Sequence, residues 1–105
     1  MELNHRVCVI TGSASGIGAA CARAFSARGA KVVVADINIE GAQSVADEIG
    51  GLAIACDVSV EANVIDLVRQ TEEQLGDIDL FFNNAGVATG GDPLETSLET
   101  WQSQW

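Results

Sequence analysis

The chain has 105 residues, of which 48% are hydrophobic and 19% are charged, so it can form one small domain with a core. Its 15 acidic and 5 basic residues give a net charge of −10, which disfavours binding to nucleic acid or to an anionic membrane surface. No segment has the pattern of a signal peptide or a membrane span, and we expect a cytoplasmic protein.

Short apolar runs alternate with amphipathic segments along the chain. The runs predict strands at residues 7–11, 31–36, 52–56 and 79–83. The segments between them predict helices at residues 16–28, at 39–49 after an Asn38 cap, and from a Ser59 cap to Gly76. In the first helix we expect one apolar face made of Ile17, Ala20, Cys21, Ala24 and Ala27.

A further helix is predicted from the capping box that begins at Thr96. The resulting β-α-β-α-β-α-β-α order predicts an α/β fold, a doubly wound parallel sheet with helices on both faces. The chain stops inside the last helix, on whose apolar face Trp101 and Trp105 fall. We therefore expect residues 1–105 to be an incomplete domain, truncated after the fourth strand and the start of the following helix.

Three cysteines, Cys8, Cys21 and Cys56, lie far apart among apolar residues, which is typical of small buried side chains in a reducing compartment. With His5 as the only histidine, neither a metal site nor a Cys–His nucleophile is predicted.

A glycine-rich turn follows the first predicted strand and opens the first helix. It reads Thr11-Gly12-Ser13-Ala14-Ser15-Gly16-Ile17-Gly18. Glycines let the backbone turn tightly and let a pyrophosphate approach it, and the helix N-terminus supplies free N–H donors. A tight turn that binds nothing is the alternative, which the β-α-β context disfavours.

Polar residues end the other three predicted strands. Asp36 can accept hydrogen bonds from both ribose hydroxyls of an adenosine, and no basic residue stands at Ser13, Ser15 or Ile37 to hold a 2′-phosphate, which favours NAD over NADP. Asp57 and Val58 fit an adenine site, although an Asp before a helix cap is also ordinary turn chemistry. The run Asn83-Asn84-Ala85-Gly86 suits a crevice wall or, alternatively, a polar turn.

Together these motifs resemble the N-terminal half of a short-chain dehydrogenase/reductase, with a Rossmann-type fold, in the family's order and spacing. The resemblance implies that Gly12, Gly16 and Gly18 shape the pyrophosphate loop beside Ile17, that Asp36 selects NAD, and that Asp57 and Val58 hold adenine. It implies that Asn84 helps to fix the central strand, with the 83–86 backbone along the ribose and nicotinamide. The complete protein is then expected to be a homo-oligomer acting on a small alcohol or ketone.

The family's catalytic Tyr and Lys, its Ser and its helix Asn have no counterpart here, because the chain has no Tyr and only Lys31. No catalytic residue can be assigned, and we expect this chain alone to be inactive. It is interpreted as the cofactor-binding half of an NAD-dependent oxidoreductase. The alternative is a stand-alone dinucleotide-binding or assembly module completed by another chain. A nucleotide-dependent methyltransferase would also place an acid after the second strand, but it does not explain residues 83–86.

Overall fold

A computed structural model describes residues 2–84 of the chain. The strands are β1 (Val7–Thr11), β2 (Lys31–Asp36), β3 (Leu52–Ala55) and β4 (Leu80–Asn83). The helices are α1 (Gly16–Ala27), α2 (Ile39–Ile49) and α3 (Glu61–Leu75). The predicted order of elements is confirmed for these residues, while the helix predicted after Thr96 lies outside the described part of the chain.

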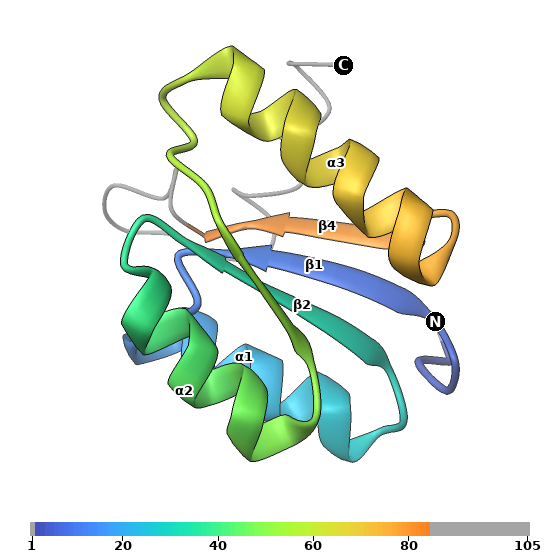
Figure 1. Ribbon diagram of the computed structural model, residues 1–105. Coiled ribbons are helices and arrows are strands. Elements are labelled where there is room, and N and C mark those ends of the chain that lie inside the picture. The colour runs from blue at the N-terminus through green and yellow to red at the C-terminus, as the bar shows by residue number, and fades with distance from the viewer. Residues whose placement is uncertain (1, 85–105) are drawn as a thin grey trace.

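All four strands form one parallel sheet in the order β3-β2-β1-β4. Figure 1 shows α1 and α2 on one face of this sheet and α3 on the other. The connections that leave β1 and β2 therefore cover one face, and the connection from β3 to β4 crosses to the other. The predicted doubly wound α/β fold is confirmed.

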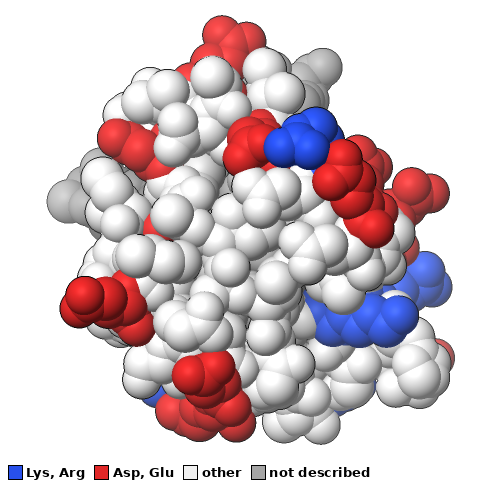
Figure 2. All heavy atoms as spheres, viewed as in Figure 1, with Lys and Arg blue, Asp and Glu red and all other residues white. Residues whose placement is uncertain are grey.

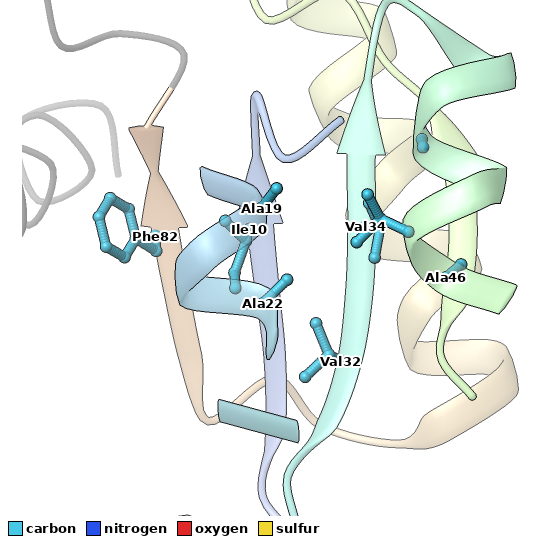
Figure 3. Packing of buried hydrophobic residues seen from close by; sticks show 9 residues of the cluster. Ile10, Ala19, Ala22, Val32, Val34, Ala46 and Phe82 are labelled. Atoms are coloured by element: carbon cyan, nitrogen blue, oxygen red, sulfur yellow. The ribbon is translucent and has the colours of Figure 1, made fainter. Parts of the chain in front are cut away.

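Alternation of side chains along the buried strands gives the sheet two hydrophobic cores. On the α1–α2 face, Ile10, Val34 and Phe82 pack against helix alanines (Figure 3). On the α3 face, Val9, Val33 and Phe81 belong to the second cluster with Leu67. Neighbouring residues of one strand thus serve opposite cores, which explains why the predicted strands are continuously apolar.

The inward face of α1 differs from the predicted one. Gly18, Ala19 and Ala22 are buried, whereas Ile17 is 57% exposed and the alanines at 20, 24 and 27 are exposed. Only Cys21 of the predicted face packs against the core, where it is half-buried. Small residues face the sheet because they let the helix backbone approach it closely. Since alanines occur on every side of α1, the spacing of apolar residues does not show which side faces the sheet.

The two predicted helix caps have different outcomes. Asn38 caps α2, its side-chain oxygen accepting from the Gly41 amide at 3.1 Å. Ser59 does not cap α3, whose N-cap residue is Val60 without a side-chain hydrogen bond. The Ser59 hydroxyl instead donates to Asp57 Oδ1 at 2.6 Å, so the Ser59 cap was a wrong prediction. The apolar residues Val64, Leu67, Val68 and Leu75 of α3 pack in the second core.

The three cysteines are free thiols, and two of them, Cys8 and Cys56, are buried. Burial raises the pKa of all three thiols, with nearby Asp79 adding to the effect at Cys8 and Asp57 at Cys56. These thiols therefore stay protonated at neutral pH and act as small hydrophobic side chains.

Acidic groups are spread over the face shown in Figure 2, whereas its basic groups lie mainly on the side where β1 begins. Arg69 on α3 pairs with Asp66 and with Glu73, and Arg23 on α1 pairs with Glu48 of α2. Among the helices of residues 2–84, none is long and apolar enough to cross a membrane.

Two buried threonines provide a matched test of the packing. Thr71 Oγ1 on α3 has no hydrogen-bond partner among the described residues, whereas Thr11 Oγ1 on β1 donates to Asn83 Oδ1 at 2.8 Å. We expect Thr71→Val to raise the free energy of unfolding by about 1 kcal/mol, because it removes a buried unpaired hydroxyl. Thr11→Val should lower it by about 1–3 kcal/mol. Urea unfolding followed by circular dichroism measures both, and equal effects would contradict the assignment.

Candidate functional site

The carboxyl ends of the four parallel strands meet at one edge of the sheet. Thr11 at the end of β1 pairs in register with Ala35 of β2 and with Asn83 of β4. Asp36 pairs with Ala55 at the end of β3. The residues predicted from four separate motifs therefore follow strands that end side by side. The strand order β3-β2-β1-β4 changes direction at β1, and open α/β sheets bind ligands at such a point of reversal.

The glycine-rich turn presents backbone N–H groups at this edge. Gly12 and Gly16 adopt positive φ angles of 64° and 61°, and α1 begins at Gly16. A Cβ atom added at Gly16 would meet nothing within 4 Å, so open space lies beside it. The N-cap residue Ser15 makes no side-chain cap hydrogen bond, and no acidic residue lies in the first turn. This helix end suits an anion.

Gly18 has a different role, because it allows α1 to pack closely against the turn. A Cβ atom at Gly18 would lie 2.3 Å from the carbonyl oxygen of Gly12 and 2.9 Å from Asn84 Nδ2. The Asn84 amide donates to the same Gly12 oxygen at 3.2 Å. The turn after β1, the start of α1 and the end of β4 are therefore held together at one carbonyl group.

Asp36 faces the glycine-rich turn from the end of β2. Its Oδ2 accepts a hydrogen bond from the Ala14 amide at 3.0 Å, and its Oδ1 accepts one from the Asn38 amide at 2.9 Å. A carboxylate has about four acceptor positions, so it can still accept from two ribose hydroxyls. The next side chain, Ile37, is 72% exposed and carries no charge.

The two serines of the turn lie differently. Ser13 is fully buried, and its hydroxyl donates to the Ile10 carbonyl at 2.6 Å and accepts from the Ala35 amide at 3.1 Å. Its side chain is directed into the protein. Ser15 is exposed at the start of α1 beside Ile17, which is also exposed. Side chains 15 and 17 can therefore contact a ligand, whereas Ser13 can do so only through its backbone.

Asp57 and Val58 follow β3 at the outer end of the same edge. Oδ1 of Asp57 accepts from the amide and the hydroxyl of Ser59, at 3.0 and 2.6 Å. These hydrogen bonds lower the pKa of the Asp57 carboxyl, which is ionised at neutral pH. Val58 is half-buried against the α3-face core. The two hydrogen bonds from Ser59 to Asp57 Oδ1 are those of an ordinary turn, which was the alternative interpretation of this residue. Asp57 Oδ2 makes no hydrogen bond to any of residues 2–84.

Asn83 is the last residue of β4, which pairs with β1 on the side opposite β2, and Asn84 follows it. Asn83 is buried and bonded to Thr11, and Asn84 is half-buried and bonded to Gly12. Both amides thus join β4 to the strand and turn that precede α1. Ala85 and Gly86, predicted to continue this wall, lie outside the described residues.

Two contacts of the site were missed by sequence reasoning. The Ala14 amide bonds to Asp36, and Asn38 adds a second backbone donor to the same carboxylate. Every residue except proline has a backbone amide, so the sequence does not show that the Ala14 amide binds Asp36. The amide of Asn38 could have been predicted, because a residue two positions after an aspartate can form an Asx-type turn with it.

All five basic residues of the chain lie away from the carboxyl edge. Arg6, Arg28 and Lys31 lie near the amino-terminal ends of β1 and β2, and Arg23 and Arg69 are paired with acids on helices. Any phosphate bound at the carboxyl edge would therefore be met by backbone N–H groups. Within residues 2–84, no group of three His, Cys, Asp or Glu side chains could hold a metal ion.

Comparison with known proteins supports this geometry. A family model described as enoyl-(acyl carrier protein) reductase matches residues 12–105. A short-chain dehydrogenase reductase 3c of Arabidopsis thaliana is 44% identical over 102 residues, which cover 94% of this chain and 38% of that protein. The chain belongs to the short-chain dehydrogenase/reductase family. The resemblance inferred from the motifs is thus confirmed.

Two further relatives carry more specific names. A meso-2,3-butanediol dehydrogenase of Serratia marcescens is 42% identical over 105 residues, covering 97% of this chain and 42% of that protein. The crystal structure of a 3-ketoacyl-(acyl-carrier-protein) reductase from Brucella melitensis complexed with NADH is 42% identical, with a TM-score of 0.74. That match covers 75% of this chain and 34% of the solved one. The chain thus spans 34–42% of the length of these three relatives.

The two glycines of α1 can be separated by experiment. We expect Gly18→Ala to lower the free energy of unfolding by about 3 kcal/mol, because its methyl group would collide with the Gly12 carbonyl. Gly16→Ala should cost only about 1 kcal/mol, since its Cβ atom meets open space and the cost is that of the positive φ angle. Thermal unfolding of both variants checks this, and a larger loss for Gly16→Ala would refute the close approach at Gly18.

Proposed function

We propose that residues 1–105 form the cofactor-binding half of an NAD-dependent oxidoreductase domain. The chain's family is that of dehydrogenases and reductases, and a solved relative holds NADH. The observation that carries the proposal is the Asp36 carboxylate beside the open start of α1. A pyrophosphate at the helix N-terminus would place the adenosine ribose toward the end of β2.

The donor set fits such a dinucleotide. Gly16 leaves space beside α1, and the unpaired amides of the first helical turn suit the pyrophosphate. Asp36 would take the ribose hydroxyls, Asp57 and Val58 would lie toward the adenine, and Ile17 would contact the cofactor. Asn83 and Asn84, with Ala85 and Gly86 after them in the sequence, would contact the nicotinamide side of the cofactor. When bound, the nicotinamide supplies the hydride acceptor or donor.

The absence of nearby positive charge favours NAD over NADP. A 2′-phosphate would meet the negative Asp36, and the neighbouring Ile37, Ser13 and Ser15 carry no charge to offset it. The ribose of NAD, in contrast, would gain two hydrogen bonds to a charged acceptor, which are among the stronger kind.

For the complete protein we propose hydride transfer between NAD and a secondary alcohol or ketone. This substrate class is supported by the family and by the Serratia relative, which is named for a diol. We further propose that the complete protein is a cytoplasmic homo-oligomer.

Replacing Asp36 and Ile37 should shift the cofactor preference toward NADP. We expect the unsubstituted chain to bind NAD more tightly than NADP. Asp36→Ala combined with Ile37→Arg should shift the affinity ratio toward NADP by at least about tenfold, because a charge-assisted hydrogen bond is lost and a phosphate partner is gained. Isothermal titration calorimetry with both cofactors measures the ratio, with Ile37→Ala as the control for altered surface. Equal affinity of the unsubstituted chain for NAD and NADP would contradict the role of Asp36.

A second prediction concerns turnover by the 105-residue chain. The chain contains no Tyr that could serve as the family's acid/base, and loss of that group alone costs about 10²–10⁴-fold in rate. We therefore expect no alcohol-dependent NADH formation across a panel of secondary alcohols, even where calorimetry detects NAD binding. Turnover on the order of 1–10³ s⁻¹, the usual range for enzymes, would show that the chain carries a catalytic group other than a tyrosine.

A further inference from the structure

We propose that Ser13 is a positioning residue for cofactor selection. Its buried hydroxyl fastens the glycine-rich turn to the end of β2, and thereby holds the Asp36 carboxylate in the orientation that distinguishes NAD from NADP. The inference rests on the proposed function and deepens it, because it assigns the selectivity to a pair of residues of which only one would touch the cofactor.

The fastening includes three hydrogen bonds between the turn and the two central strands. The Ser13 hydroxyl donates to the Ile10 carbonyl of β1 at 2.6 Å, and its oxygen accepts from the Ala35 amide of β2 at 3.1 Å. The Ser13 amide donates to the Ala35 carbonyl at 3.3 Å. Because Ser13 is fully buried, water cannot replace these bonds without opening the turn.

The residues next to this fastening carry the selectivity. Ala14 follows Ser13, Asp36 follows Ala35, and the Ala14 amide donates to Asp36 Oδ2 at 3.0 Å. The turn is therefore joined to β2 at two successive residues, first through the Ser13 hydroxyl and then through the Asp36 side chain. A turn that shifts away from β2 would withdraw the Ala14 amide and release the carboxylate to rotate.

A serine is well suited to this position because one small side chain must both donate and accept. Alanine would leave the buried Ala35 amide without the Ser13 oxygen, and a larger side chain has no room at a fully buried turn residue. The requirement is distinct from the glycine requirement of the turn, because it concerns a side-chain hydroxyl and not a backbone conformation.

The test is the ratio of NAD and NADP affinities in Ser13→Ala, measured by calorimetry on the 105-residue chain. We expect NAD binding to weaken about tenfold and NADP binding to weaken less, so that the ratio falls. In an Asp36→Ala background, Ser13→Ala should leave the ratio unchanged, because the effect passes through that carboxylate. A ratio that falls equally in both backgrounds would overturn the proposal.

A second measurement needs no ligand. Amide hydrogen exchange at Ala14 should become faster in Ser13→Ala, while exchange at Gly41, whose amide is bonded to the Asn38 cap, stays unchanged. Unaltered exchange at Ala14 would contradict the proposed fastening. If Ser13→Ala loses its fold by circular dichroism, both measurements are made in the Thr71→Val background, which we expect to be more stable because it lacks the unpaired Thr71 hydroxyl.

The matched control is Ser26→Ala. The Ser26 hydroxyl on α1 also donates to a backbone carbonyl, that of Ile49 at 3.2 Å, in a partly buried position. Ser26 lies near the other end of α1, far from the glycine-rich turn. We expect Ser26→Ala to reduce stability and to leave the ratio of NAD and NADP affinities unchanged. If Ser26→Ala lowers this ratio as much as Ser13→Ala does, the positioning role of Ser13 is refuted. Absence of any NAD binding by the unsubstituted chain would contradict the proposed function and this inference together. Binding with an unchanged ratio in Ser13→Ala would contradict the inference alone.

Discussion

The contact between the start of α1 and the Gly12 carbonyl is the constraint on which this structure depends. With a Cβ atom at Gly18 only 2.3 Å from that oxygen, the helix can begin where it does only if residue 18 is glycine. The same oxygen accepts from Asn84, so the helix, the turn and β4 share one fixed point. Two residues earlier the surroundings differ, because a Cβ atom at Gly16 would meet nothing within 4 Å.

Asp36 combines a structural and a proposed binding role in one carboxylate. Two backbone amides, those of Ala14 and Asn38, already hold it, so its orientation is set before any ligand arrives. Preorganisation of this kind removes part of the entropic cost of binding. It also means that replacing Asp36 does not act on the ribose alone, because the Ala14 end of the turn loses its partner. Altered cofactor preference at this position therefore comes with a looser turn.

The sequence predicted the fold more accurately than its local details. The order of the elements, the parallel sheet and the convergence of its strand ends follow from apolar runs, turn glycines and the rules for parallel sheets. The inward face of α1 was wrong because alanines surround that helix and leave periodicity little contrast. The Ser59 cap was wrong because an aspartate two residues earlier accepts its hydroxyl. The burial of Ser13 could not be predicted, since it depends on contacts with Ile10 and Ala35.

A net charge of −10 is compatible with an anionic cofactor because of where the charges lie. The basic residues are either paired on helices or near the amino-terminal side of the sheet. Attraction of a pyrophosphate at the carboxyl edge then comes from the α1 N-terminus, equivalent to about half a positive charge. This attraction acts over a short range, so it would stabilise a pyrophosphate bound directly on the turn. It would not stabilise the 2′-phosphate of NADP, which would lie on the ribose beside Asp36. At the proposed cofactor site both features would therefore favour NAD over NADP: no cation is present to hold a 2′-phosphate, and the Asp36 carboxylate would repel it.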